Sequence, residues 1–182
     1  MPLATTNAKG NLAVKRSVAR VIVLYILTLG LYGLYWFYVS REQVTKELGT
    51  NDSAGWQTVG LIVPILNFFI YYWLLRDIDV LQRKARLDGF SAGGYLSIII
   101  AASLLSWIPI FGWALAIGAV VIMGLVVAKL NEYWDTKTNG KATEAPIAGG
   151  EVAVIAIGVA FWAAMILLVT LGAFSGSAEL NY

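Results

Sequence analysis

Among its 182 residues the sequence has no cysteine and no histidine. Without cysteine there can be no disulfide and no thiolate-bound iron–sulfur cluster, and without both residue types the usual zinc sites and a histidine-ligated haem are excluded. The commonest general base and the best thiol nucleophile are missing as well. We therefore expect no metal, no cofactor and no catalytic residues, and we predict that the protein is not an enzyme.

Charged residues are scarce, at 13% of the chain, whereas a soluble domain has about 25%. The formal net charge is only +2, so nucleic-acid binding is not expected. Hydrophobic residues make up 59% of the sequence, and the mean hydropathy is +0.73. Runs without any charge cover residues 21–40, 53–75, 89–128 and 152–178. Each reaches about the 20 residues that a spanning helix needs. The sequence therefore predicts an all-α integral membrane protein.

The apolar runs contain similar interruptions. Pro64-Ile65-Leu66-Asn67-Phe68 matches Pro109-Ile110-Phe111-Gly112-Trp113, and Thr28-Leu29-Gly30 and Thr170-Leu171-Gly172 are variants without proline. Glycine and asparagine tolerate a left-handed backbone, which is typical of a helix end. The predicted breaks are Gly30, Pro64, Asn67, Pro109, Gly112 and Gly172. We interpret the pattern as repeated helix–break–helix hairpins with about seven helical arms, ending in one spanning helix.

The chain is treated as a single membrane domain over residues 1–182. It divides into a disordered tail (1–11), hairpin units 1 (12–49), 2 (50–89) and 3 (90–135), a linker (136–150) and a C-terminal transmembrane helix (151–174). The arms of units 1 and 2 hold only about ten apolar residues, too few to cross about 30 Å, so these hairpins would be re-entrant. The alternative is five kinked transmembrane helices, which would place Arg41 and Lys46 outside. We favour the hairpins, because every lysine and arginine then lies on the cytoplasmic side.

Part of the sequence resembles a known family. Arg16-Ser17-Val18, the segment TLGLYGLYW at residues 28–36, and Arg41-Glu42 are similar to the opening of the prokaryotic membrane-protein family catalogued as domain of unknown function 4234. The resemblance covers roughly residues 16–86, and the sequence after Gly89 departs from it. It implies a small multi-pass protein of a prokaryotic cytoplasmic membrane and no particular activity. With the positive-inside rule, we expect the N-terminus in the cytoplasm and the C-terminus outside.

Two groups of residues are candidate contact sites. Ala153, Ala156, Ala160 and Ala164 form a small-residue ridge on the last helix, which favours close helix packing, either with a partner or with the chain's own helices. The basic residues Arg16, Arg20, Arg83, Lys84 and Arg86 are expected at lipid headgroups, where an ordinary positive-inside loop explains the last three better than a specific lipid site. The aromatic clusters at residues 35–38 and 71–73 are interpreted as interface anchors.

These observations favour a non-catalytic accessory or scaffold subunit of a membrane complex or homo-oligomer, packed through small-residue faces. The expected partners are membrane lipids and either another protein or a second copy. The alternative is a small channel or transporter for a neutral solute, built on the breaks at Asn67 and Gly112. No charged residue lies inside an apolar run, which makes transport less favoured, and Asn67 is better explained as a helix cap.

Overall fold

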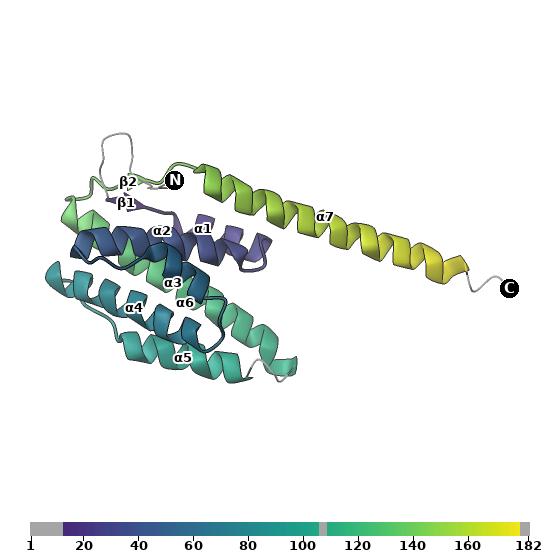
Figure 1. The fold of residues 1–182 in the computed structure, drawn as a ribbon, viewed down its shortest axis with the longest axis horizontal. Helices are drawn as coiled ribbons and strands as arrows, with labels where there is room; N and C mark the ends of the chain where they lie inside the picture. Colours follow the sequence, from purple (N-terminus) through teal and green to yellow (C-terminus); the bar gives the residue numbers. More distant parts are fainter. Residues whose placement is uncertain (1–12, 106–108, 179–182) are drawn as a thin grey trace.

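The computed structural model describes residues 13–105 and 109–178, with side chains for 13–104 and 117–171, and this part is all-helical apart from one short strand pair (Figure 1). The seven helices described are α1 (Val18–Leu27), α2 (Leu31–Leu48), α3 (Ala54–Gly60), α4 (Leu66–Lys84), α5 (Ala92–Leu105), α6 (Pro109–Lys137) and α7 (Gly149–Ala178). Strands β1 (Val14–Lys15) and β2 (Thr143–Glu144) pair in parallel. The strand pair ties the segment before α1 to the segment before α7.

Helices α1 to α6 form three hairpins that lie side by side, and α7 extends well beyond them (Figure 1). The turns after α1 and α3 and the junction of α5 with α6 lie at one end, which we call the tip end. The opposite end, where α2, α4 and α6 finish and α7 begins, is the charged end. The six helices of these hairpins differ in length, from seven residues in α3 to 29 in α6. The structure therefore does not show a repeated unit.

The first unit doubles back instead of continuing as one kinked helix. Gln43, near the end of α2, donates from Nε2 to the Val14 carbonyl at 3.2 Å and accepts from Arg16 Nη1 at 3.4 Å. Both partners precede α1, so the outer ends of α1 and α2 meet. This contact is incompatible with the kinked-helix alternative for unit 1.

The turn between α1 and α2 explains the TLGLYGLYW segment. Leu29 and Gly30 have φ angles of 51° and 89°, so the backbone is left-handed over two residues. Thr28 Oγ1 donates to the Leu24 carbonyl at 2.7 Å and accepts from the Tyr32 amide at 2.8 Å, which joins the two helices. The predicted break at Gly30 is therefore a real reversal, with a conformation that favours glycine.

The other predicted breaks have mixed outcomes. Pro64 lies in the turn between α3 and α4, and Pro109 is the first residue of α6, where proline fits because its missing N–H has no partner to lose. Gly112 and Gly172 lie inside α6 and α7, so the breaks predicted at these two positions are wrong. A helical glycine costs only about 1 kcal/mol, and the apolar helix formers around each one continue the helix. Asn67 also does not act as the expected cap, because its Oδ1 is buried without a hydrogen-bond partner among the described residues.

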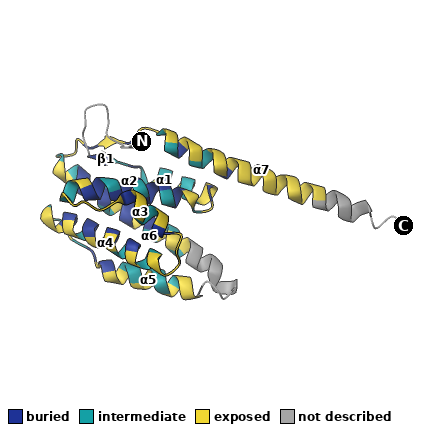
Figure 2. Cartoon of the chain, viewed as in Figure 1, coloured by how far each residue is buried: buried dark blue, intermediate teal, exposed yellow. Residues whose placement is uncertain are grey.

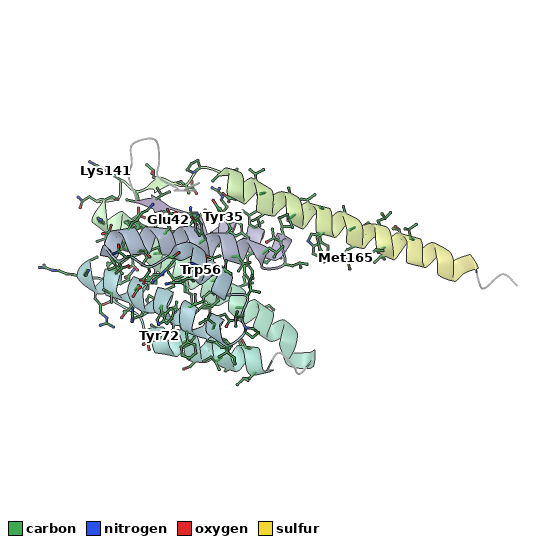
Figure 3. All side chains as sticks on the ribbon, in the orientation of Figure 1. Tyr35, Glu42, Trp56, Tyr72, Lys141 and Met165 are labelled. Atoms are coloured by element: carbon green, nitrogen blue, oxygen red, sulfur yellow. The ribbon has the colours of Figure 1, made fainter. Side chains whose placement is uncertain are left out.

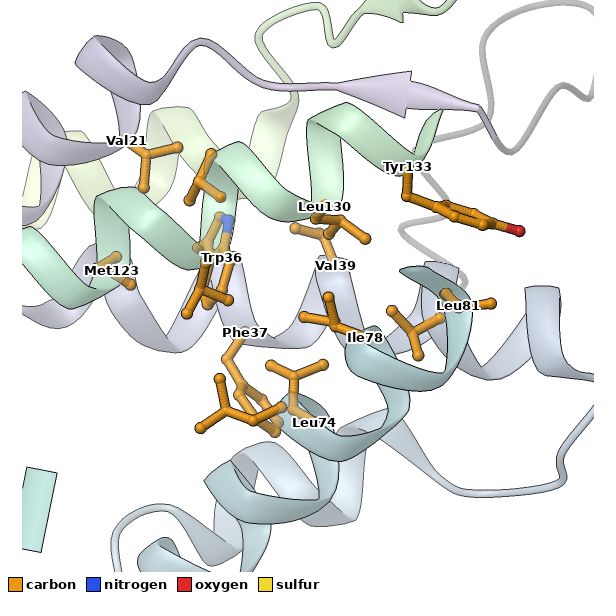
Figure 4. Close-up of a cluster of buried hydrophobic side chains, with 14 of the residues drawn as sticks. Val21, Trp36, Phe37, Val39, Leu74, Ile78, Leu81, Met123, Leu130 and Tyr133 are labelled. Carbon is orange, nitrogen blue, oxygen red and sulfur yellow. The ribbon is translucent and has the colours of Figure 1, made fainter. Parts of the chain in front are cut away.

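The core lies where α2 is surrounded by the other helices (Figure 4). Tyr35, Trp36 and Phe37 are 8%, 3% and 0% exposed, so this part of the aromatic cluster is core and not an interface anchor. Phe37 packs edge-on against Tyr71 of α4, with the ring centroids 5.6 Å apart. The prediction failed here because a large aromatic side chain suits a helix core as well as a membrane interface.

We predict that Gly30→Ala destabilises the protein by about 1–2 kcal/mol, because an L-residue with a side chain resists a left-handed backbone. The matched control is Gly55→Ala in α3, where the added Cβ meets nothing closer than Ser53 Oγ at 3.9 Å. Because a helical glycine costs about 1 kcal/mol relative to alanine, this control should leave the free energy of unfolding unchanged or raise it by up to about 1 kcal/mol. Denaturant unfolding in detergent measures both, and equal losses would contradict the assigned turn.

Candidate functional site: a charged end and an apolar end

Ion pairs hold the charged end together. The Arg41 side chain is buried in α2 and donates to Asp77 Oδ2 of α4 at 2.5 Å and to Asp52 Oδ2 at 2.9 Å. Asp77 also accepts from Arg76 at 2.9 Å. A buried guanidinium needs such partners, because an unpaired charge in the interior is strongly unfavourable. Arg41 thus fixes the second hairpin against the first.

A second cluster connects α7 to the first hairpin. Glu151, in the first turn of α7, is 1% exposed. Its Oε1 accepts from Arg20 Nε at 2.8 Å and from the Tyr32 hydroxyl at 3.1 Å, and its Oε2 accepts from Arg20 Nη2. Arg20 Nη1 also donates to the Ala145 carbonyl at 2.7 Å. The fork of the guanidinium matches the carboxylate, and the helix N-terminus favours the negative charge. We call this arrangement the Glu151 clamp.

Arg16 is also used inside the molecule. It is 4% exposed. Its backbone N–H donates to Asn131 Oδ1 at 3.1 Å, and its carbonyl accepts from Asn131 Nδ2 at 2.7 Å. Burial lowers the pKa of its guanidinium, although Tyr35 and Glu151 oppose that shift. Arg16 and Arg20 therefore serve internal contacts here, and not the headgroup contacts that we expected. Burial and the ion pair with Glu151 are the physical reasons.

The remaining predicted headgroup residues lie on the surface. Arg83, Lys84 and Arg86 are exposed where α4 ends, at the charged end. Arg83 also pairs with Asp79 at 2.9 Å. The hydrogen bond that Arg83 Nε donates to Asp79 Oδ2, together with the negative charge of that carboxylate, raises the pKa of Arg83. All three side chains remain accessible to an anionic surface.

Many of the described residues at the tip end are exposed (Figure 2), and large apolar side chains are among them. Ile62, Ile65 and Leu104 are 71%, 74% and 70% exposed there. Scattered exposed apolar residues are normal in soluble proteins, whereas several large ones at one end make that end a candidate for contact with a membrane or a partner. In Figure 3, Glu42 and Lys141 lie at the charged end while Met165 lies far along α7.

Two helices are long and apolar enough to cross a membrane. The first is Ile117–Lys137 in α6, which has a mean hydropathy of 1.4 and is 39% buried inside the protein. The second is Gly149–Leu171 in α7, which has a mean hydropathy of 2.8 and is only 6% buried. A core helix of a soluble protein would be mostly buried, which α7 is not. Its apolar surface needs a covering that the described chain does not supply.

Helix α7 meets the first hairpin through one face. The clamp residue Glu151 and Gly158 are buried there, and Trp162 Nε1 donates to the Leu27 carbonyl at 2.8 Å. A Cβ added to Gly158 would come within 3.0 Å of Thr28 Cγ2, so only glycine allows this approach without a shift. An apolar groove of about 400 Å³ continues along the same contact, lined by residues that include Leu24, Leu27 and Trp162.

The predicted alanine ridge lies on the other side of α7. Ala153, Ala156, Ala160 and Ala164 are all exposed. With about 100° per residue, they point away from the face formed by Glu151, Gly158 and Trp162. The chain's own helices therefore dock on a different face, and the ridge is free for another contact.

Sequence reasoning missed Glu151, Arg41 and Asn131 as structural residues. Glu151 alone had a visible indication, since it is a single acid directly before an uncharged run of 27 residues at 152–178. Within the side chains described, no group of three or more acidic residues is placed to hold a metal.

Comparisons of the chain with protein-family models, with curated proteins and with solved structures find no match. The resemblance over residues 16–86 therefore remains an expectation.

We predict that Glu151→Gln lowers the free energy of unfolding by about 1.5–3 kcal/mol, since it removes a charge-assisted bond and leaves Arg20 without its counter-ion. The control is Glu42→Gln, which breaks the i,i+4 pair with Lys46 at the surface and should cost no more than about 0.5 kcal/mol. Unfolding of both variants at the same pH and salt concentration measures the difference. If Glu151→Gln is as stable as the control, the clamp does not hold α7.

Proposed function

We propose that this chain is a non-catalytic accessory or scaffold protein of a membrane, with its hairpins inserted into one leaflet and α7 crossing the bilayer. The observation that carries this proposal is the separation of the molecule into a charged end and an uncharged, exposed apolar tip end. In water the exposed tip would be unfavourable by about 25 cal/mol for each Å² of apolar surface. Hydrocarbon around the tip removes that penalty.

The depth of insertion follows from the contacts of α7. Gly158 and Trp162, which touch the first turn, come nine and 13 residues after Gly149, so the turn lies about 14–20 Å along the helix. That is about half of the 30 Å hydrocarbon core. Helix α7 continues for 16 residues beyond Trp162, or about 24 Å. The first hairpin then ends near the bilayer midplane, whereas α7 reaches the far side.

Orientation follows from the basic residues. Arg16, Arg41, Arg83 and Lys137 belong to the charged end, and positive residues remain on the cytoplasmic side. The N-terminus would then be cytoplasmic and the C-terminus outside. With the resemblance described above, the membrane is the cytoplasmic membrane of a prokaryote.

The free alanine ridge supports a scaffold role. Apolar side chains gain little by leaving lipid for another helix, so close packing of small residues drives association there. Ala156, Ala160 and Ala164 allow such an approach on the face that the bundle leaves uncovered. A membrane protein partner or a second copy of this chain fits that surface.

No observation favours the channel or transporter over the scaffold. The groove beside α7 and the cavity within the bundle are both lined mainly by apolar side chains. Gly112 lies within α6, and so it does not form a helix break with Asn67.

The hairpin topology is tested with single cysteines, because the chain has none of its own. We predict that Thr50→Cys, in the exposed loop after α2, is not labelled in intact cells by a membrane-impermeant thiol reagent. Ser177→Cys near the end of α7 should be labelled. Thr45 is 7% exposed and would be shielded in any topology, so Thr50 is the better probe. Labelling of Thr50→Cys from outside would contradict insertion from the cytoplasmic side.

We predict that Ala160→Leu inserts normally but reduces recovery of the associated form, because overpacking a helix contact costs about 1–3 kcal/mol. Ala163→Leu is the comparison variant, since Ala163 lines the groove beside α1 and lies about 60° around the helix from Ala160. Native mass spectrometry after mild extraction reports the stoichiometry of each variant. Unchanged association of Ala160→Leu would exclude the ridge as the docking surface.

A further inference from the structure

A cavity of about 170 Å³ lies inside the bundle, between α1, α2, α4, α5 and α6. It is lined by Tyr25, Trp36, Tyr71, Leu74, Leu75, Ile99, Ala119, Ile122, Met123 and Val126. Five different helices contribute, so the cavity forms only when the hairpins are assembled. Ala119 is exposed, which places an opening on the surface beside α6.

The lining residues have few polar side-chain groups, and each of these groups is able to donate a hydrogen bond. They are the hydroxyls of Tyr25 and Tyr71 and the indole N–H of Trp36. None of the three has a hydrogen-bond partner among the residues that the structure describes. The two tyrosines are close enough to interact electrostatically. A donor in apolar surroundings is unfavourable until an acceptor reaches it, which gives this cavity a chemical preference.

The position of Tyr25 is set by two glycines of α2 and its turn. A Cβ added to Gly33 would lie 2.9 Å from Tyr25 Cε2, and one added to Gly30 would lie 3.5 Å from its hydroxyl. Trp36, Leu74 and Leu75 are 3%, 1% and 2% exposed, and so they are held by the surrounding core. Part of the cavity wall therefore belongs to the hydrophobic core of the bundle.

We propose that this cavity binds a molecule with a single six-membered ring that carries a carbonyl group. An apolar cavity of about 150 Å³ accommodates benzene, so the volume here suits one ring and not a fused system. The carbonyl oxygen accepts from Tyr25 or Tyr71, while the ring contacts Leu74, Ile99 and Met123. Tyr25 is one turn before the break at Thr28, so the site lies toward the tip end.

The same chemistry has two sources, a quinone head group dissolved in the membrane and a small free aromatic ketone. The binding site itself depends on the bundle alone and not on the proposed membrane role. Only the first source rests on insertion into the bilayer. A failure of the labelling experiment above would therefore leave ring binding to be judged by its own measurements.

The test measures binding of acetophenone and of ethylbenzene, which has nearly the same shape without the carbonyl, to the purified full-length protein by equilibrium dialysis in detergent. Ala119→Phe blocks the opening and provides the background from partition into micelles. We expect both probes to bind above that background, with acetophenone preferred about fivefold to tenfold, the value of one hydrogen bond of about 1 kcal/mol. Equal binding to Ala119→Phe and to the unaltered protein would overturn the site.

The role of the hydroxyls is tested by Tyr25→Phe and Tyr71→Phe, which keep the ring and remove the donor. At least one should reduce the preference for acetophenone to less than about twofold and leave ethylbenzene binding unchanged. Tyr72→Phe is the matched control, because Tyr72 does not line the cavity, and it should keep the full preference. If neither variant changes the preference, the assignment of a carbonyl acceptor is wrong.

The source is resolved in lipid nanodiscs with a long-tailed benzoquinone as competitor. Displacement of acetophenone supports a membrane quinone, and lack of displacement together with retained acetophenone binding supports a small free ketone. Loss of acetophenone binding on moving from detergent to lipid would overturn the proposal, because the site must work in the protein's own surroundings.

Discussion

The carboxylate of Glu151 determines how the two parts of the molecule fit together. Its bonds to Arg20 and Tyr32 hold the start of α7 against the first hairpin at the charged end. Because a helix is rigid, this one attachment also fixes how far along the first hairpin each later residue of α7 lies. Gly158 and Trp162 therefore contact the turn between α1 and α2. The face that makes these contacts is fixed too, and the alanines on the other side remain free. A buried ion pair adds little net stability, but it specifies one arrangement among several apolar ones.

Charge and length then explain the shape of the whole. Arg41 forms ion pairs with Asp52 and Asp77 and so joins α2 to α4, which brings these charged groups together at one end. Between Arg20 and Arg41 the first hairpin carries no charge, and α1 has only ten residues, or about 15 Å. This short hairpin with an uncharged tip, beside a 30-residue helix, is the geometry on which the proposed insertion into lipid rests.

The sequence predicted the helical class and the reversal at Gly30, because both depend on local chemistry. A left-handed glycine after an apolar run leaves a recognisable pattern, and so does a charge-free run of helical length. It wrongly predicted breaks at Gly112 and Gly172. A similar glycine pattern occurs there, but the surrounding residues continue the helix through it. It could not show that Arg16 and Arg20 turn inward, since their partners Asn131 and Glu151 are more than 100 residues away. Long-range pairs of this kind have no periodicity to detect.

The glycines of the TLGLYG segment link the fold to its most specific feature. Gly30 permits the reversal through its φ of 89°, and Gly33 leaves the space that the Tyr25 ring occupies. One short segment therefore both folds α2 back onto α1 and places a phenol at the wall of an apolar cavity. If the segment served only the turn, a larger residue at Gly33 would be acceptable, since its backbone is helical. The absence of a side chain at that position is explained by the Tyr25 ring, which a Cβ at Gly33 would approach to 2.9 Å.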